Sequence, residues 1–251
     1  MGQGLELRKD YLISIIIATF NAGETLQDCL DSIVMQSFKG IEVVVVDGGS
    51  TDQTIPILER TILPGLTWRS EPDNGIFDAM NTGIDRASGR WLYFMGSDDR
   101  LLPGFSEIAG KLQSPNTVYY GIPKGYYIQE KKPDFVLLGG KFSRYKMAKY
   151  CLNHQVIVYP AKAFLKYRYQ LKYSVLADYV LNIQVWGDTD FKKKFIPVEI
   201  ALYNMTGNSA FKKDPELARD KPAIIKTNMG LLVYWRWLFK IYKKKLRGET
   251  F

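Results

Sequence analysis

The stretch Arg90-Trp-Leu-Tyr-Phe-Met-Gly-Ser-Asp-Asp99 decides the fold of this 251-residue chain. Its first part, 91–95, is a short apolar run rich in aromatic side chains, long enough for a buried strand and too short for a helix. The run stops at Gly96, and two adjacent carboxylates follow, Asp98 and Asp99. Adjacent carboxylates at the end of a buried strand repel each other, and Mg²⁺ or Mn²⁺ that also binds substrate phosphates would suit them. A polar turn is the alternative, since Ser-Asp-Asp is also ordinary turn chemistry.

The ninety residues up to this point alternate between predicted strands and predicted helices. The strands are nearly continuous runs of apolar residues, which is typical of a parallel sheet covered on both faces. We predict strands over residues 12–19, 41–46, 67–70 and 90–95, and helices over 24–36, 53–60 and from 76 to about 88. This βαβαβαβ order predicts an α/β fold with a doubly wound, mostly parallel sheet.

A polar cluster follows each predicted strand, at residues 19–21, 47–52, 73–75 and 97–99. Ligands of such sheets bind beyond the carboxyl ends of the strands, so we expect the four clusters at one edge. The common nucleotide-binding patterns are missing from the sequence: no Gly-x-Gly-x-x-Gly follows the first strand, and no P-loop occurs. The site is therefore expected to handle phosphates with carboxylates and a metal ion.

The composition is that of a globular protein, with 46% hydrophobic and 24% charged residues. The net charge of +8 favours anionic partners, which include nucleotides, nucleic acid and an anionic membrane surface. The single histidine, His154, excludes a zinc site that needs two and disfavours a Ser-His-Asp hydrolase. The polar segment 1–10 is unlike a signal peptide, and no apolar run is long enough to span a bilayer, so we expect a cytoplasmic protein.

Four stretches, 15–21, 45–52, 71–84 and 96–99, resemble those of the family 2 inverting glycosyltransferases, in the branch that builds bacterial surface polysaccharides such as O-antigen, capsule and colanic acid. They occur in the family's order and cover most of residues 12 to 103. The resemblance implies a GT-A fold, with a smaller mixed acceptor-side region and a C-terminal helix added to the doubly wound sheet. It divides the chain into a nucleotide-sugar-binding half, an acceptor-binding and catalytic half of the same domain, and a basic helical segment: 1–103, 104–212 and 213–251.

The resemblance also implies roles on the donor side. Thr19, Phe20 and Asn21 would line the base pocket, and Asp47 would accept a hydrogen bond from the base. Asp73 would lie on the donor side of the cleft. Asp98 would contact the ribose or sugar, and Asp99 would hold Mn²⁺ or Mg²⁺ on the diphosphate. A carboxylate at the end of a buried strand can make a strong charge-assisted bond to a base N–H. The alternative for Asp47 is that it only caps the turn that follows it.

In the second half, the family's acidic motif implies that Asp178 is the catalytic base. Asp178 opens a predicted helix over 176–186, where the helix dipole stabilises an anion. The branch often has a second acid two residues later, but Val180 stands there in this chain. A plain first-turn acid is the alternative.

Two further pairs of residues match the family's acceptor side and its diphosphate loop. His154 and Gln155 match a pair on the acceptor side, although a structural role is the alternative for the histidine. Gly207 and Ser209 match the diphosphate loop, where Asn208 replaces the second glycine of the family's pattern.

The remaining elements of the second half are less distinct. We predict a helix over 104–111 and strands over 117–120, 126–129, 156–159, 195–197 and 200–203. The basic and aromatic segment 130–150 is interpreted as an acceptor-facing loop or a solvated loop.

The C-terminal residues 215–247 are predicted to be mostly helical. Leu231, Trp235, Leu238 and Tyr242 recur on one predicted face, while Arg236, Lys240, Lys243 and Arg247 recur on another. Such a basic amphipathic helix can lie in the interface of an anionic membrane. Packing on the catalytic domain is the alternative.

These observations predict a metal-dependent inverting glycosyltransferase. It would move a sugar from a nucleotide-sugar, first of all a UDP-sugar, to a hydroxyl of a lipid-linked glycan at the inner face of the plasma membrane. GDP- and dTDP-sugars remain alternatives, because guanine and thymine also present N–H groups. The rival classes are a sugar-nucleotide pyrophosphorylase, a catalytically degenerate scaffold and a nucleic-acid-binding protein. The four acidic clusters disfavour nucleic acid as a partner.

Overall fold

The computed structural model describes residues 11–128, 130, 137–207 and 212–247. Its strands are β1 (Ile13–Thr19), β2 (Ile41–Asp47), β3 (Leu66–Ser70), β4 (Trp91–Gly96), β5 (Arg100–Leu101), β6 (Thr117–Tyr126), β7 (Ile157–Pro160) and β8 (Lys192–Asn204). Its helices are α1 (Leu26–Val34), α2 (Thr54–Arg60), α3 (Ile76–Arg86), α4 (Gly104–Ala109), α5 (Arg144–Lys149), α6 (Ala177–Gly187), α7 (Pro215–Met229) and α8 (Leu231–Leu246), with the 3₁₀ turns η1 (His154–Val156) and η2 (Ala161–Leu165). The strands form one eight-stranded sheet in the order β3-β2-β1-β4-β7-β6-β8-β5.

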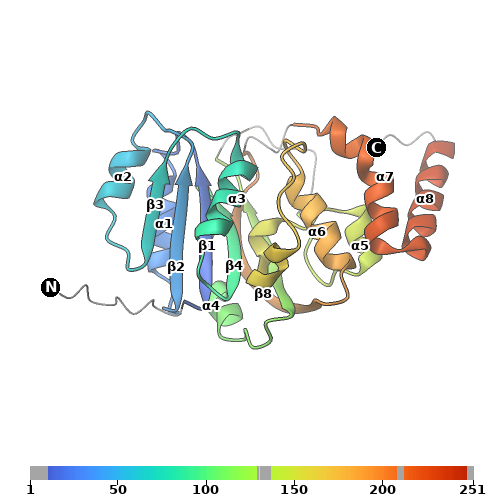
Figure 1. Ribbon diagram of the computed structural model, residues 1–251, viewed down its shortest axis with the longest axis horizontal. Coiled ribbons are helices and arrows are strands. Elements are labelled where there is room, and N and C mark those ends of the chain that lie inside the picture. The colour runs from blue at the N-terminus through green and yellow to red at the C-terminus, as the bar shows by residue number, and fades with distance from the viewer. Residues whose placement is uncertain (1–10, 129, 131–136, 208–211, 248–251) are drawn as a thin grey trace.

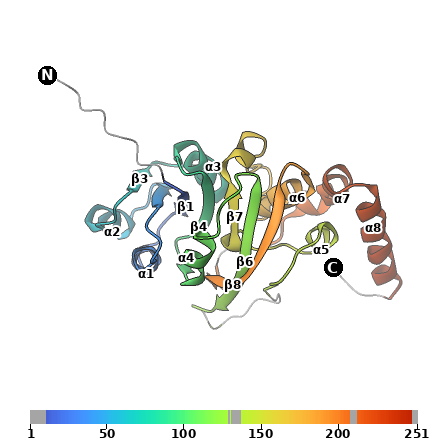
Figure 2. The ribbon, with the colours of Figure 1, turned by 90° about the horizontal axis from the view of Figure 1, so that it is seen from below.

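The first four strands of the sheet are parallel to one another, as predicted. Figure 2 shows α3 on one face of this part of the sheet and α1 and α4 on the other. Every residue of β1 and β2 is buried as a result, which explains why these strands are apolar on both faces. The apolar runs therefore predict this half of the sheet correctly.

The second half of the sheet is mixed. β7 is antiparallel to both β4 and β6, whereas β8 is parallel to β6 and antiparallel to β5. The α/β fold with a smaller mixed region is confirmed, and one continuous sheet joins the two predicted halves of the domain (Figure 1).

Two pairs of predicted strands are wrong in their boundaries. Residues 117–126 form the single strand β6, and residues 192–204 form the single strand β8. Their pairing shifts register between Tyr120 and Pro123, opposite Phe195 to Ala201. This irregularity accommodates Pro123 and Pro197 within the two strands.

The basic segment 130–150 contains a helix that the sequence interpretation misses. Ser143 caps α5 by accepting a 3.1 Å hydrogen bond from the backbone N–H of Lys146. Met147 and Ala148 are fully buried in the core. This part of the segment is therefore not a solvated loop; residues 129 and 131–136 lie outside the described part of the chain.

The C-terminal helical stretch consists of two helices, α7 and α8. They are joined at Gly230, whose φ of 87° and ψ of 160° belong to a region that only glycine occupies readily. Of the predicted apolar face of α8, Leu231, Trp235 and Tyr242 are exposed, whereas Leu238 packs partly against the core. Figure 1 shows the two helices side by side at the end of the molecule farthest from β3.

Candidate active site

The sheet brings the predicted polar clusters together at one edge, and Asp47 pairs with Ser70 at the end of β3, so the segment that carries Asp73 also begins there. Thr19 pairs with Asp47 in the parallel register of β1 and β2, and Ala18 pairs with Gly96 in that of β1 and β4. The segments that follow these strands therefore begin side by side at the carboxyl edge of the sheet. Asp98 and Asp99 lie in the segment that follows β4.

The turns after β1 and β2 are tied to each other. The backbone N–H of Asn21 donates to Ser50 Oγ at 2.7 Å, and the backbone N–H of Thr51 donates to Asn21 Oδ1 at 3.0 Å. Asn21 has a left-handed φ of 49°, a conformation that asparagine tolerates. The Phe20 side chain beside it is 63% exposed, so its ring is free to face a ligand at this edge.

Asp47 is fully buried, and its carboxylate caps the turn that follows it. Oδ2 accepts hydrogen bonds from Gly49 N at 3.1 Å, Ser50 N at 2.8 Å and Ser70 Oγ at 2.6 Å. Ser50 Oγ also donates to Oδ1. These contacts are those of the turn-capping alternative, while the hydrogen bond to a base stays a prediction.

Asp73 lies directly over Gly48. A Cβ added at Gly48 would be 3.0 Å from Asp73 Oδ2, so the missing side chain makes room for this carboxylate. The backbone N–H of Gly75 donates to Asp73 Oδ1 at 2.7 Å. Burial and, after it, the nearby charges of Asp78 and Asp47 raise the pKa of Asp73. The sequence interpretation selects Asp73 but misses the glycine beneath it.

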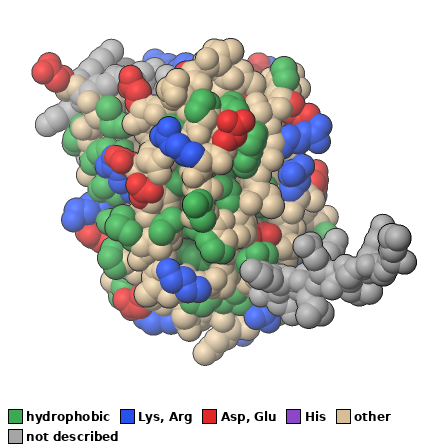
Figure 3. All heavy atoms as spheres, turned by 90° about the vertical axis from the view of Figure 1, so that its left-hand side faces the viewer, with side chains coloured by type: hydrophobic (Ala, Val, Ile, Leu, Met, Phe, Trp, Pro, Cys, Tyr) green, Lys and Arg blue, Asp and Glu red, His purple; other side chains and the backbone are tan. Residues whose placement is uncertain are grey.

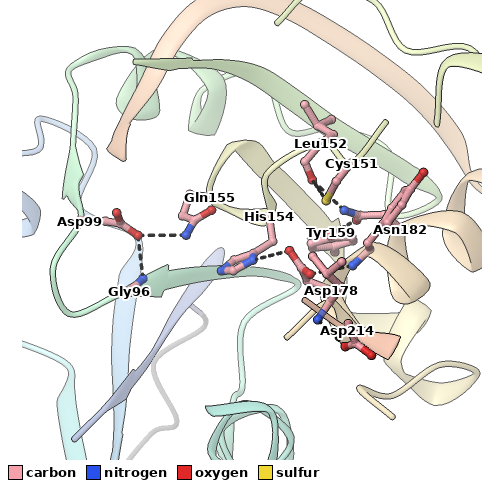
Figure 4. A network of polar contacts seen from close by, with 12 residues as sticks. Gly96, Asp99, Cys151, Leu152, His154, Gln155, Tyr159, Asp178, Asn182 and Asp214 are labelled. Atoms are coloured by element: carbon pink, nitrogen blue, oxygen red, sulfur yellow. Dashed lines mark hydrogen bonds and ion pairs between the residues drawn. The ribbon is translucent and has the colours of Figure 1, made fainter. Parts of the chain in front are cut away.

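The two acids after β4 differ in their surroundings. Asp99 is 1% exposed and accepts hydrogen bonds from Gly96 N at 3.1 Å, Gln155 Nε2 at 3.0 Å and Asn204 N at 2.8 Å (Figure 4). Asp98 is half-buried, and its Oδ2 accepts a 2.7 Å hydrogen bond from Asn204 Nδ2. Asn204 thus holds both acids, a role that the sequence interpretation misses.

The acid pair has the chemistry of a site for Mg²⁺ or Mn²⁺. Burial and, after it, the charge of Asp98 raise the pKa of Asp99 to about 7. A cation beside the pair would favour the ionised form of both carboxylates. Among the described residues, no group of three or more His, Cys, Asp or Glu side chains could hold a metal ion. Two carboxylates fit a metal that takes its other ligands from a diphosphate and water.

The predicted base and the predicted acceptor-side histidine are in contact. Asp178 lies in the first turn of α6, and its Oδ2 is 3.0 Å from His154 Nδ1. Both side chains are buried. Tyr179 N donates to the other carboxylate oxygen, Oδ1, at 2.7 Å. The histidine therefore fixes one oxygen of the carboxylate.

The turn η1 joins the two acidic parts of the site. It directs Gln155 toward Asp99 and the preceding residue, His154, toward Asp178, as Figure 4 shows. His154 Nε2 and Gln155 Oε1 are buried without a hydrogen-bond partner in the described part of the chain. Four predicted site residues thus form one polar network between the end of β4 and the start of α6.

The predicted diphosphate loop also begins beside the acid pair. A Cβ at Gly207 would lie 3.3 Å from Asp98 Oδ2. Ser209, the other residue predicted there, lies outside the described residues. The start of this loop therefore faces the acid that is more open to a ligand.

The fold and the paired acids at its carboxyl edge define a glycosyltransferase of the GT-A class. The family model for glycosyl transferase family 2 matches residues 14–168, more than half of the chain. The chain therefore belongs to glycosyl transferase family 2, which confirms the resemblance. The matched region ends before Asp178.

Relatives and solved structures agree with this assignment. A PGL/p-HBAD biosynthesis glycosyltransferase of Mycobacterium bovis is 33% identical over a 233-residue alignment that covers 88% of this chain and 88% of the relative. Residues 1–349 of S. aureus TarS, in complex with UDP-GlcNAc, share the fold with a TM-score of 0.66, 20% identity and coverage of 86% of this chain. This chain spans 66% of that TarS chain, just under two thirds. The mannosyltransferase PcManGT from Pyrobaculum calidifontis, in complex with GDP-Man and Mn²⁺, gives a TM-score of 0.60 at 13% identity, over 95% of this chain and 83% of the other.

Proposed function

We propose that this glycosyltransferase moves a sugar from a nucleotide-sugar, with a UDP-sugar as the proposed donor, to an acceptor hydroxyl. The configuration at the anomeric carbon would be inverted. The observation that supports the proposal most is the network that links Asp99 to Asp178. It would join the acid proposed to hold the metal to the proposed base, across the edge where GT-A ligands bind. The nucleotide-sugars bound to TarS and PcManGT support the donor class.

The donor side is proposed to be built from the turns after β1, β2 and β3. Phe20 would offer its exposed ring to the base, with Thr19 and Asn21 beside it. Asp47 would accept a base N–H if it gave up one of its turn contacts, and Asp73 would face the nucleotide from above Gly48. A carboxylate can pair with uracil, guanine or thymine N–H groups, so GDP- and dTDP-sugars stay as alternatives.

The acid pair is proposed to hold Mg²⁺ or Mn²⁺ with the donor diphosphate. When bound, the ion would neutralise the diphosphate and act as a Lewis acid on the leaving group. Asp98 would also contact the ribose or sugar, and Gly207 and Ser209 would lie by the diphosphate. Asn204 and Gln155 keep both carboxylates in position through their hydrogen bonds.

Asp178 is proposed to take the proton from the acceptor hydroxyl. The hydroxyl oxygen forms the new bond to the anomeric carbon, and the old bond to that carbon breaks with its electron pair on the nucleoside diphosphate. The His154 contact holds Asp178 Oδ2 in a single orientation, which positions the carboxylate for proton transfer.

The acceptor is proposed to be a lipid-linked glycan in cell-surface polysaccharide synthesis, which would place the enzyme peripherally on the inner face of the plasma membrane. The name of the mycobacterial relative, a PGL/p-HBAD biosynthesis glycosyltransferase, supports a biosynthetic role. None of the described helices is long and apolar enough to cross a membrane.

The rival classes have less support. A pyrophosphorylase should have a glycine-rich basic loop after its first strand. The loop here, Phe20-Asn-Ala-Gly-Glu24, is neither glycine-rich nor basic. A degenerate scaffold is disfavoured because each predicted acid is present. A thermal-shift screen of UDP-, GDP- and dTDP-sugars with and without Mn²⁺ tests the proposal. We expect a UDP-sugar to raise the Tm most, and only with Mn²⁺; no shift with any nucleotide-sugar would overturn it.

A further inference from the structure

Helix α8 has an apolar stripe that the rest of the fold does not cover. On its inner side Trp237 is buried and Leu238 packs against the core, next to α5 and α7. Six large side chains on the helix are instead between 58% and 88% exposed: Leu231, Leu232, Trp235, Phe239, Tyr242 and Leu246. The spacing of four, four, three and four residues from Leu231 to Leu246 places five of them along one face, with Leu232 at its edge. The fold accounts for the inner face only.

A basic groove lies beside this stripe, between α5 and α8. Its volume is about 370 Å³, and it is lined by Tyr145, Arg236, Phe239, Lys240, Lys243, Lys244 and Arg247. The Arg236 guanidinium lies 4.1 Å from the centre of the Tyr145 ring, and the Lys243 ammonium lies 4.6 Å from that of Phe239. Among the described residues that line it there is no Asp or Glu, so the groove is suited to anionic groups.

The charge of the chain is concentrated in the same region. Residues 221–247 contain eight Lys and Arg residues and no Asp or Glu, and the net charge of the chain is +8. The remaining residues are therefore balanced in charge. Figure 3 shows the opposite end of the molecule, where basic and acidic side chains are interspersed. An anionic surface would thus attract the α8 end of the molecule first.

We propose that the outer stripe of α8 and the groove beside it form a docking surface for an anionic lipid bilayer. The aromatic and aliphatic side chains of the stripe would enter the boundary between headgroups and acyl chains. The groove would take the phosphates of anionic headgroups. A second copy of the chain fits less well, because two surfaces of the same strong charge would repel each other.

Vesicle binding by the full chain tests this surface directly. The probes are vesicles of phosphatidylcholine alone and of phosphatidylcholine mixed with phosphatidylglycerol. We expect binding to the mixed vesicles only, and weaker binding as salt rises. Lys240→Glu with Lys243→Glu should weaken binding about 30-fold or more, at about 1 kcal/mol for each basic residue lost. Trp235→Ser with Phe239→Ser should remove most of the salt-resistant binding.

Matched controls separate this surface from general effects. Ile62→Ser removes an apolar side chain that is 94% exposed between α2 and β3, and Lys162→Glu reverses an exposed charge on η2. Neither should change vesicle binding. Equal binding by wild type and both α8 double variants would overturn the proposal. The proposal would also be overturned if the wild type were a dimer that bound no vesicles and the Trp235→Ser and Phe239→Ser changes converted it to a monomer.

The inference rests on the proposed function only through the lipid-linked acceptor. Vesicle binding is measured without donor or acceptor, and nucleotide-sugar affinity is measured by calorimetry on the same variants. Lost vesicle binding with unchanged donor affinity supports the docking surface. If the wild type transfers sugar but binds no vesicles, the docking-surface proposal is wrong and the proposed function is unaffected.

Discussion

Asp178 is the residue on which the proposed chemistry depends most. Asp178→Asn keeps the shape of the side chain and removes its basicity. We expect nearly unchanged donor affinity and a kcat reduced by roughly 10²–10⁴, the usual contribution of a positioned general base. Calorimetry with the donor and turnover measured on one preparation check this.

Asp190→Asn is the matched control for that experiment. Asp190 and Asp188 both form ion pairs with Lys166 beyond the other end of α6, away from His154. The control should turn over normally. Normal turnover by Asp178→Asn would show that another group takes the proton.

His154 offers a test of whether it positions Asp178 or itself accepts the proton. An asparagine at this position can place its amide near the site of Nδ1, but it has no counterpart of Nε2. His154→Leu should therefore lower kcat tenfold to a hundredfold, because a hydrogen bond to a charged group contributes about 1.5–3 kcal/mol. His154→Asn should recover much of that loss, with donor KM unchanged in both variants. Equal loss in both would indicate that Nε2 is needed.

The stability of the metal-free protein should depend on the protonation of Asp99. Its pKa is raised to about 7 in the folded protein, so the folded state binds more protons than the unfolded state between about pH 4 and 7. The contribution of this group to stability is therefore present at low pH and is lost as pH rises through 7. Urea unfolding in EDTA should show this fall, and Asp99→Asn should reduce it. Mn²⁺ should stabilise the wild type more at pH 8 than at pH 5; an equal effect would contradict a metal at this acid.

At the scale of elements, Gly230 determines how α8 packs against α7. Apart from its chain neighbours, no described residue has an atom within 4 Å of the Cβ that an alanine would add, so Gly230→Ala acts on the backbone energy. With φ at 87° and ψ at 160°, we expect a loss of about 1–3 kcal/mol in the free energy of unfolding, measured in urea. Gly110→Ala is the control, because Gly110 has helical φ and its nearest atoms are 3.7 Å away. A neutral Gly230→Ala would mean that the α7–α8 junction adapts.

The elements that the sequence predicts best are those whose environment is uniform. β1, β2 and β4 are buried along most of their length, so their apolar runs coincide with the strands. β6 and β8 are each predicted as two strands because their irregular pairing is defined only by the partner strand. α5 is short, and its cap at Ser143 is a weak signal beside many basic residues.

The candidate site also contains residues that local patterns predict and residues that only long-range contacts define. Its acids follow strands at positions that local patterns mark, and they were predictable. Asn204 is not, because its contact with Asp99 spans 105 residues and no short motif marks it. The link from His154 to Asp178 likewise depends on how η1 and α6 pack, although both residues were predicted individually.

At the scale of the whole molecule, the charge distribution predicts how activity depends on the form of the acceptor. With a vesicle-embedded acceptor, Trp235→Ser with Phe239→Ser should raise the apparent KM, because less enzyme is held at the surface. With a water-soluble acceptor, the same variant should match the wild type. Rising salt should slow only the first reaction, because it screens the attraction between the eight cations of 221–247 and the lipid. An equal effect of the variant in both assays would point to damage to the fold.

The turn η1 also has a consequence for engineering this enzyme. His154 and Gln155 are consecutive, so neighbouring Cα atoms about 3.8 Å apart set the spacing between the supports of the two acids. Libraries aimed at new donor specificity should therefore leave residues 154–155 unchanged and vary 19–21, 70 and 73. Inserting one residue into η1 would alter the reach of both supports at once, so catalysis should be lost even where nucleotide affinity survives.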